Sequence, residues 1–144
     1  AIQREGGLSP DRAQATLRYD QTRVILTASM LVAAPDVRFA VHGTKASFLS
    51  SGLDVQEDQL KAGMTVGGPG WGVCAHPPIR VEGETGQRTP ITGPAGNYPA
   101  YYAGVAAALR GLGPNPVPPE QALAVMEVLE AGIESDRLRR EVAL

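Results

Sequence analysis

The sequence contains a single cysteine, Cys74, and carries almost no net charge. A lone cysteine excludes an internal disulfide and argues against a zinc site built from cysteines, which suits a reducing cytoplasm. A net charge of -2 excludes long-range attraction to nucleic acid or to an anionic membrane. The sequence also lacks an apolar run of the roughly 20 residues that a membrane span needs. We therefore predict a cytoplasmic protein with no nucleic-acid partner and no membrane partner.

Length and composition predict one domain. The chain has 144 residues, of which 43% are hydrophobic, and this suffices for one ordinary core. It opens with Ala1-Ile2-Gln3-Arg4 rather than with methionine. We expect residues 1–144 to form a single domain and to be a fragment or processed product of something longer, although a cleaved tag would leave the same start.

Alternation of apolar and polar residues predicts strands in the first half of the chain. The expected strands cover residues 13–19, 24–30, 37–42 and 46–48, with turns at 20–22 and 43–44. They form two antiparallel hairpins, separated by a break at Pro35-Asp36. Residues 79–83 and 88–91 are expected to form two short edge strands or an ordered loop.

Capping signals predict a short helix over residues 56–62. Asp54 is a good N-cap, Glu57 stands three residues later to complete a capping box, and Gly63 suits the C-cap. The helix should be about two turns long.

Two longer helices are expected in the second half. Asn97 caps a helix over residues 98–110, which ends in the stretch that begins at Gly111. Another helix begins at Pro119 and places apolar residues at amphipathic spacing as far as Ile133. Residues 141–144 are a candidate for a last short strand.

Strands first and helices later predict an α+β fold: a predominantly antiparallel open β-sheet with helices packed on one face. The side chains of the other face are mixed rather than fully charged. They include Ile25, Thr27, Ser29, Leu31, Arg38, Ala40 and His42. We expect another subunit or another domain to cover that face.

The segment from Arg38 to Gly63 contains motifs typical of one enzyme family. They are His42-Gly43-Thr44-Lys45, Ser47-Phe48 and Gly52-Leu53-Asp54-Val55-Gln56-Glu57-Asp58. Weaker matches follow at Pro69-Gly70-Trp71-Gly72, Gly96-Asn97-Tyr98 and Tyr101-Tyr102. Together these motifs resemble the C-terminal domain of the Gfo/Idh/MocA family, the glucose-fructose oxidoreductases and inositol dehydrogenases. The likeness extends over nearly the whole chain, and residues 42–58 carry its specific part.

This resemblance implies an NAD(P)-dependent oxidoreductase acting on a sugar, a polyol or a related hydroxylated substrate. Family members bind NAD or NADP in an N-terminal Rossmann domain, and they use the lysine of a Glu-Lys-Pro motif and a histidine four residues after an aspartate. Neither lysine of this chain lies in such a motif, and neither histidine follows an aspartate at that spacing. The Rossmann domain and the catalytic residues are therefore expected to lie outside the chain, which alone would bind no cofactor and be inactive.

The resemblance also implies two partners. One is the Rossmann domain of the same protein. The other is a further copy of the chain, in a homo-oligomer that forms through the open face of the sheet.

Residues 70–75, GWGVCA, satisfy the G-x-G-x-x-A pattern of a dinucleotide-binding loop. Such a loop follows a strand and opens a helix, whereas Gly67-Gly68-Pro69 precedes this segment and His76-Pro77-Pro78 follows it. We expect an ordered loop there and predict no cofactor-binding residue. Cys74 and His76 supply only two candidate metal ligands, too few for a zinc site.

Three residues are candidates for lining a substrate pocket: Trp71, His42 and Tyr98. The large ring of Trp71, on a mobile Gly-rich loop, suits the wall of a sugar or polyol pocket. His42 is a candidate because histidine is the residue type that commonly serves as an acid or base, but its place at a strand end also suits a packed or hydrogen-bonded structural role. The tyrosines near residue 98 suit helix packing, with one hydroxyl free to reach a partner. No catalytic residue is predicted.

A second hypothesis, from another class, is a free-standing, non-catalytic binding or assembly module derived from such a domain. The coding sequence upstream of Ala1 separates the two hypotheses. The sequence leaves open the substrate, the choice between NAD and NADP, and the choice between a dimer and a tetramer. It also leaves open whether the chain is an engineered piece, a proteolytic fragment or a natural stand-alone protein.

Overall fold

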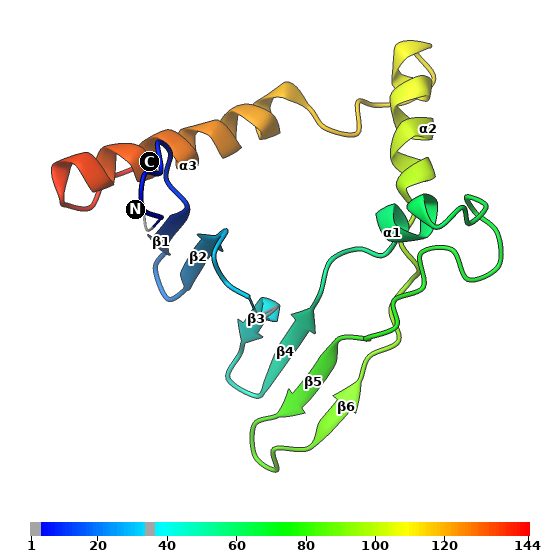
Figure 1. The fold of residues 1–144 in the computed structure, drawn as a ribbon, viewed down its shortest axis with the longest axis horizontal. Coiled ribbons are helices and arrows are strands. Elements are labelled where there is room, and N and C mark those ends of the chain that lie inside the picture. The colour runs from blue at the N-terminus through cyan, green and yellow to red at the C-terminus, as the bar shows by residue number, and fades with distance from the viewer. Residues whose placement is uncertain (1–3, 34–36) are drawn as a thin grey trace. The chain divides into compact units, whose positions relative to one another are not determined.

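A computed structural model describes residues 4–33 and 37–144 (Figure 1). Within these ranges the chain forms two antiparallel sheets and three helices, so the predicted antiparallel α+β class is confirmed. The chain divides into two compact units. The first comprises Ala1–Ala34 and Val117–Leu144, and the second comprises Pro35–Pro116. The predicted break at Pro35-Asp36 lies outside the described residues.

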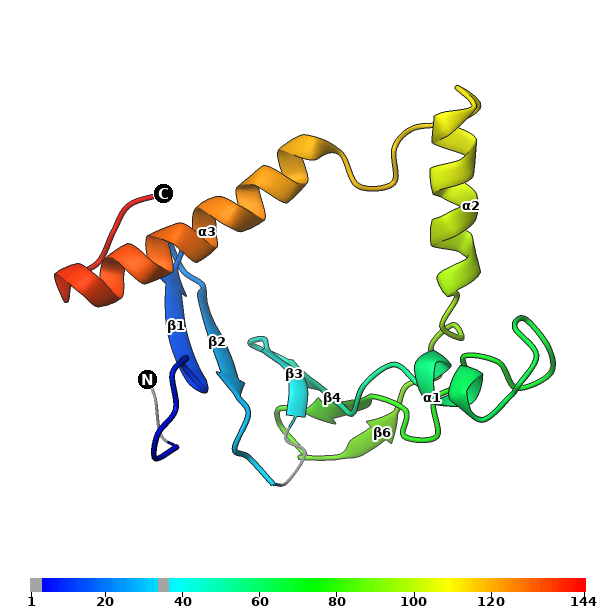
Figure 2. The ribbon, with the colours of Figure 1, turned by 45° about the horizontal axis from the view of Figure 1, so that its top comes forward.

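The first unit contains one β-hairpin, formed by β1 (Arg12–Arg18) and β2 (Arg23–Ser29) (Figure 2). The strands pair antiparallel from Arg12 opposite Ser29 to Arg18 opposite Arg23. The guanidinium group of Arg23 closes the turn, because its Nη1 donates to the carbonyl oxygens of Tyr19 at 2.7 Å and Thr22 at 3.0 Å. The first predicted hairpin is confirmed.

The same unit contains the longest helix, α3 (Pro119–Leu138). Proline at its first position lacks the N–H that a helix leaves unpaired there, so the predicted start is confirmed. The helix ends at Arg139, which adopts a left-handed conformation with φ of 54°. The candidate strand at residues 141–144 was wrong. The Ser135 hydroxyl donates to the carbonyl of Arg140 at 2.7 Å, and the chain that follows is irregular.

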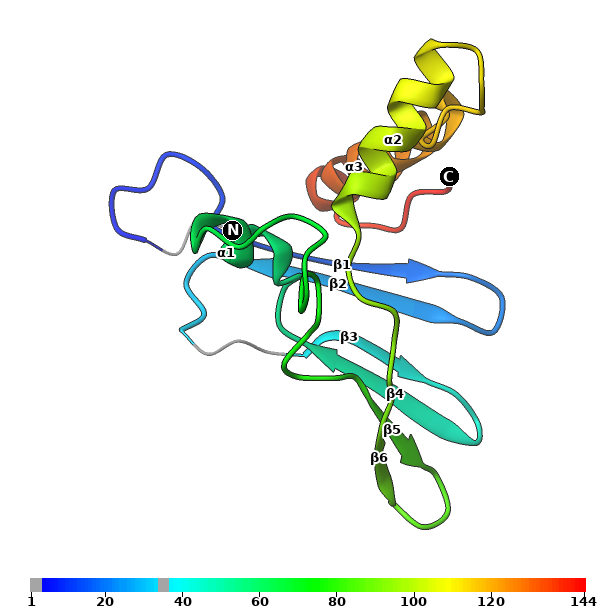
Figure 3. The same cartoon turned by 90° about the vertical axis from the view of Figure 1, so that its right-hand side faces the viewer.

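The second unit contains a four-stranded sheet in the order β3-β4-β5-β6 (Figure 3). Its strands are β3 (Val37–His42), β4 (Ala46–Ser51), β5 (Ile79–Glu82) and β6 (Arg88–Pro90). All neighbours pair antiparallel. The second predicted hairpin, the β3–β4 pair, is therefore confirmed, and residues 79–91 form strands rather than a loop. Of these two short strands only β6 is at the sheet edge, because β5 pairs on both sides.

Two helices complete the second unit, α1 (Gln56–Lys61) and α2 (Tyr98–Leu109). Asn97 caps α2 as predicted, since its Oδ1 accepts from the backbone N–H of Ala100 at 3.1 Å. Each helix is followed by a glycine with positive φ, Gly63 at 79° and Gly111 at 69°. Backbone hydrogen bonds back into the last turn stop both helices at these glycines.

The predicted capping box of α1 was wrong. Val55 occupies the N-cap position and makes no side-chain capping bond. The Asp54 carboxylate still satisfies one backbone donor, because its Oδ1 accepts from the N–H of Gln56 at 2.8 Å. Glu57 does not turn back to the N-terminus. Its carboxylate pairs instead with Lys61, one turn further along the helix, at 2.6 Å.

Little of the described chain is buried. Trp71, at 8% exposure, is the only hydrophobic residue among residues 4–33 and 37–144 that is nearly covered, and the Gln56 side chain, at 1%, is fully covered. Apolar residues on the strands and helices are open to solvent, as Phe39 at 56% and Ile133 at 73% illustrate. The described residues are most deeply covered at Gln56, at Trp71 and, in the first unit, at Asp11. No described helix is both long enough and apolar enough to span a membrane.

Candidate functional site

The side chain of Gln56 joins three segments that are distant in the sequence. Its Oε1 accepts from the indole Nε1–H of Trp71 at 2.9 Å and from the backbone N–H of Tyr98 at 2.8 Å. Its Nε2 donates to Asp54 Oδ1 at 3.0 Å. An amide oxygen has two lone pairs, so this acceptor is fully used. The first turn of α1, the loop at Trp71 and the first turn of α2 therefore meet at one amide group.

Gln59 provides a second attachment for the same loop. Its Nε2 donates to the carbonyl of Gly70 at 3.1 Å, and its Oε1 accepts from the N–H of Gly72 at 2.7 Å. Residues three apart share a helix face, so Gln56 and Gln59 hold the loop from one side of α1. The backbone on both sides of Trp71 is fixed by Gln59, and the ring is fixed by Gln56.

Two glycines allow the loop and the start of α2 to approach each other. The N–H of Gly96 donates to the carbonyl of Gly72 at 2.9 Å. A Cβ at Gly72, where φ is 71°, would overlap the carbonyl oxygen of Gly96. A Cβ at Gly96 would lie 2.5 Å from Gln56 Nε2 and 2.7 Å from Asp54 Oδ2. Both positions therefore need glycine. We call the assembly of Asp54, Gln56, Gln59, Trp71, Gly72, Gly96 and Tyr98 the Gln56 junction.

The charged pair of α1 lies beside this junction and is open to solvent. A hydrogen bond from Lys61, reinforced by its charge, lowers the pKa of Glu57 below its ordinary value. The same bond and the charge of Glu57 raise the pKa of Lys61. Both groups remain ionised at neutral pH, which suits a solvent-facing helix surface rather than acid-base chemistry.

The structure brings two of the three predicted pocket residues together. Trp71 and Tyr98 are both bonded to Gln56, whereas His42 lies at the end of β3 and takes no part in the junction. The His42 Nδ1 is 2.9 Å from the hydroxyl oxygen of Ser47, its partner across the β3–β4 pair, as a structural histidine would be. The loop of Trp71 is held by hydrogen bonds, which fits the ordered loop expected for residues 70–75 and not the mobility suggested for the Trp71 ring. The role of all three in lining a pocket stays a prediction.

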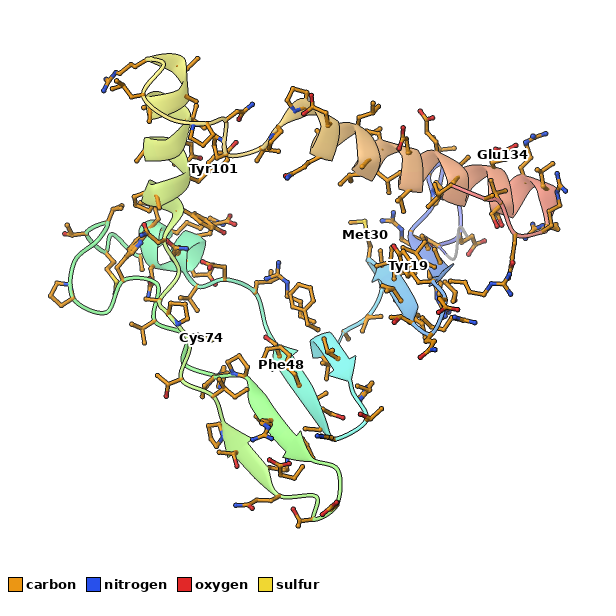
Figure 4. All side chains as sticks on the ribbon, turned by 180° about the vertical axis from the view of Figure 1, so that it is seen from behind. Tyr19, Met30, Phe48, Cys74, Tyr101 and Glu134 are labelled. Atoms are coloured by element: carbon orange, nitrogen blue, oxygen red, sulfur yellow. The ribbon has the colours of Figure 1, made fainter. Side chains whose placement is uncertain are left out.

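Aromatic side chains project from the start of α2. Tyr98 is 48% exposed, although its backbone N–H is held by Gln56. Tyr101 and Tyr102 are also exposed, and their rings meet edge to face with centroids 5.4 Å apart. Figure 4 labels Tyr101 on this helix. Phenol groups combine an apolar ring with a hydroxyl, a combination that suits contact with a hydroxylated carbon skeleton.

Residues 70–75 do not have the setting of a dinucleotide-binding loop. They lie in the irregular segment between α1 and β5, where Figure 4 labels Cys74. No strand leads into this segment and no helix begins at its end, within the part of the chain that the structure describes. The predicted ordered loop is confirmed. A pyrophosphate group would find neither the strand-to-helix turn nor the helix N-terminus that such a loop provides.

Cys74 and His76 do not assemble a metal site in the described part of the chain. The Cys74 thiol donates to the backbone carbonyl of His76 at 3.2 Å. No group of three or more histidine, cysteine, aspartate or glutamate side chains is close enough to hold a metal ion among the residues that the structure describes.

Sequence reasoning missed Gln56 and Gln59 as the residues that organise the site. Gln56 is the first residue of the helix predicted over residues 56–62 and carries no local signal of burial, because glutamine is usually exposed. One signal could have found the site. The motifs at residues 52–58, 69–72 and 96–98, which carried the family resemblance, are the segments that the Gln56 junction joins.

Comparison with known proteins gives consistent matches along the chain. A family model described as "Oxidoreductase family, C-terminal alpha/beta domain" matches residues 2–144. The chain is 45% identical over 143 residues to the uncharacterized oxidoreductase YdgJ of Escherichia coli, covering 98% of the chain and 41% of YdgJ. It is 31% identical over 148 residues to scyllo-inositol 2-dehydrogenase (NADP(+)) IolW of Bacillus subtilis, covering 99% of the chain and 41% of IolW.

Solved structures agree with these relatives. YPO2259 of Yersinia pestis superimposes with a TM-score of 0.89 at 40% identity, covering 100% of this chain and 42% of YPO2259. The yvaA protein of Bacillus subtilis gives a TM-score of 0.90 at 30% identity, covering 100% of this chain and 43% of yvaA. The chain thus spans about two fifths of the length of the proteins that it matches.

Proposed function

The chain belongs to the Gfo/Idh/MocA oxidoreductase family as its C-terminal alpha/beta domain, and from this premise we propose that it forms the substrate side of an NAD(P)-dependent oxidoreductase. The substrate would be a sugar, a polyol or a related hydroxylated compound. The relative IolW, named as a dehydrogenase of scyllo-inositol with NADP(+), supports both the polyol and the cofactor class.

One observation in the structure carries this proposal. The Gln56 junction holds the first turn of α2 by the backbone of Tyr98 while leaving the Tyr98 phenol half exposed. Ligand sites combine apolar surface with a few polar groups in fixed positions, and an anchored tyrosine supplies both. Tyr98 is therefore the main lining residue of the proposed pocket. Trp71, which donates to the same Gln56 oxygen, is the second candidate, and His42 on the β3–β4 hairpin is the third.

The described residues do not fit the cofactor itself. The glycine pattern at residues 70–75 has no strand before it and no helix after it. We therefore assign dinucleotide binding, hydride transfer and the catalytic lysine and histidine to an N-terminal Rossmann domain of the same protein. In this proposal the chain binds and orients the substrate, and it has no activity without the Rossmann domain.

An assembly role is the second candidate function. On β3, Phe39 is 56% exposed and Val41 is 62% exposed. Both lie on the side of the strand opposite to Ala40 and His42, which belong to the face that we expected a partner to cover. Exposed apolar residues that share one sheet face suit contact with another protein surface. We propose that this face takes part in a homo-oligomer in the cytoplasm, alongside the substrate role or, in a free-standing module, in place of it.

The test begins with the coding sequence upstream of Ala1. We expect a βαβ unit with its glycine loop and a Glu-Lys-Pro stretch, and a start codon close to Ala1 would contradict the oxidoreductase proposal.

The full-length product should reduce NAD+ or NADP+ with inositols or aldoses as substrates. The absorbance of the reduced nicotinamide measures this reaction. As a control, the 144-residue chain should bind neither NADH nor NADPH in a calorimetric titration. Micromolar binding would contradict the assignment of the cofactor to other sequence.

A further inference from the structure

Gln56 connects parts of the second unit that are far apart along the chain. Its Oε1 accepts a hydrogen bond from the indole N–H of Trp71, which is 15 residues away in the sequence. The same oxygen accepts a second one from the backbone N–H of Tyr98, which is 42 residues away. The side chain is 1% exposed, and its amide nitrogen is held by Asp54. Water cannot easily replace these partners at a covered site, so the amide is a main contact among the three segments, beside the Gln59 bonds and the bond from the Gly96 N–H to the Gly72 carbonyl.

Neither attached segment needs Gln56 in order to form. The helix α2 has its own cap, because Asn97 Oδ1 accepts from the N–H of Ala100. The loop at residues 70–72 has its own attachment, through the two hydrogen bonds of Gln59. Gln56 instead joins the first turn of α2 directly to α1 and Trp71, whereas the bond from the Gly96 N–H to the Gly72 carbonyl holds only the residue before the cap. Its contribution is position rather than secondary structure.

We propose that Gln56 is a positioning residue of the substrate site, which fixes the place of the Tyr98 hydroxyl through the Tyr98 backbone. This inference rests on the proposed function, in which Tyr98 lines that site. Gln56 itself touches neither substrate nor cofactor. A hydrogen bond to substrate from Tyr98 depends on the position of its hydroxyl, and a backbone anchor at the same residue sets the point from which the side chain extends.

A double-mutant cycle in the full-length protein tests the coupling of the two residues. Tyr98→Phe removes the hydroxyl and should raise KM for the polyol about tenfold, the effect of one lost hydrogen bond. Gln56→Met keeps the side-chain length and removes the acceptor. In the Gln56→Met background, Tyr98→Phe should change KM by less than about twofold, because the hydroxyl is already misplaced.

Gln59→Met is the matched control. It removes a glutamine of the same helix that holds the same loop but makes no bond to Tyr98. In this background Tyr98→Phe should retain its roughly tenfold effect on KM. If Gln56→Met does not fold, Gln56→Asn replaces it. This substitution keeps the amide group but shortens the side chain by one methylene, which moves the oxygen away from its two donors. The same loss of coupling is expected.

The outcomes separate the two proposals. A full-length protein that oxidises no polyol or sugar overturns the proposed function and this inference with it. An active protein in which Tyr98→Phe has an equal effect in the wild-type and Gln56 backgrounds overturns the inference alone. The same holds if Tyr98→Phe has no effect on KM in the wild-type protein. Loss of coupling with Gln56 but not with Gln59 supports positioning, because a merely structural defect would reduce both.

Discussion

Gly72 is the residue at which an added side chain would cause the most severe steric overlap with the backbone. Its φ is 71°, and a Cβ there would meet the carbonyl oxygen of Gly96. Gly70, two residues earlier, has a φ of 80°, but a Cβ added there would meet no atom within 4 Å. The two positions share a left-handed backbone and differ in steric contact.

We therefore predict that Gly72→Ala is much more damaging than Gly70→Ala. Gly70→Ala should cost about 1–2 kcal/mol of unfolding free energy, the usual penalty for an alanine in the left-handed region. Gly72→Ala should cost about 2 kcal/mol more, because the loop must move away from Gly96 and strain the Gln56 junction. Urea denaturation of the full-length protein measures both. Equal losses for the two variants would show that the contact between Gly72 and Gly96 does not restrict the loop.

At the scale of secondary-structure elements, α2 depends on its N-cap. Asn97 Oδ1 accepts from the N–H of Ala100, and the first turn of this helix carries no acidic side chain. Asn97→Ala should lower the unfolding free energy by about 1 kcal/mol. Asn97→Asp keeps an acceptor and adds a charge that favours a helix N-terminus, so it should be neutral or slightly stabilising. Thermal unfolding followed by circular dichroism compares them, and an alanine variant as stable as the aspartate variant would contradict the prediction.

The helix α1 allows a prediction about pH. The pKa of Glu57 is lowered by its hydrogen bond to Lys61, and the pKa of Lys61 is raised by the same bond. The stabilising effect of Glu57 is present above the ordinary glutamate pKa and is lost as pH falls through the lowered value. The effect of Lys61 is present below the ordinary lysine pKa and is lost as pH rises through the raised value.

Glu57→Gln should therefore be slightly less stable than the wild type at neutral pH and equally stable in acid, below the lowered pKa. The difference should shrink in high salt, because the pair is fully exposed. Asp58→Asn is the control, since Asp58 acts on Lys61 only as a weaker, secondary charge. Denaturation midpoints at both pH values give the result. A difference that persists in acid would point to helix propensity rather than to the ion pair.

At the scale of the whole molecule, the main observation is the amount of apolar surface left open in both units. Ile25 and Ile133 in the first unit and Phe39 and Leu60 in the second are all exposed. A denaturant m-value increases with the surface that unfolding exposes. Since each unit by itself covers so few apolar side chains, unfolding of either unit should expose little more surface.

We predict that the 144-residue chain alone unfolds in urea with an m-value below about 1 kcal/mol/M, under the usual range for small domains. It should also bind a hydrophobic dye such as ANS. The full-length protein is the comparison, and there the dye should bind weakly. A steep transition and weak dye binding by a monomer of the short chain, with mass checked by light scattering, would contradict this account.

Most of the elements could be predicted from local patterns. Alternating residues such as Val37, Phe39 and Val41 determined a strand, and Asn97 and Gly111 marked the two ends of α2. Such signals depend on neighbours a few residues apart, so they can be read directly. Glu57 showed the limit of this approach. The capping box and the pair with Lys61 are both local options, and only the backbone at Val55 decided between them.

The site depended on contacts over longer distances. Nothing local distinguishes Gln56 from an exposed helical glutamine, because its burial results from Trp71 and Tyr98 approaching from other segments. The sequence by itself determined the α+β class, the hairpins, most helix ends and the family. Only the tertiary structure decided that Gln56 is the covered centre and that Trp71 is fixed. The physical reason is that a polar side chain becomes buried only when distant segments supply all its hydrogen-bond partners at once.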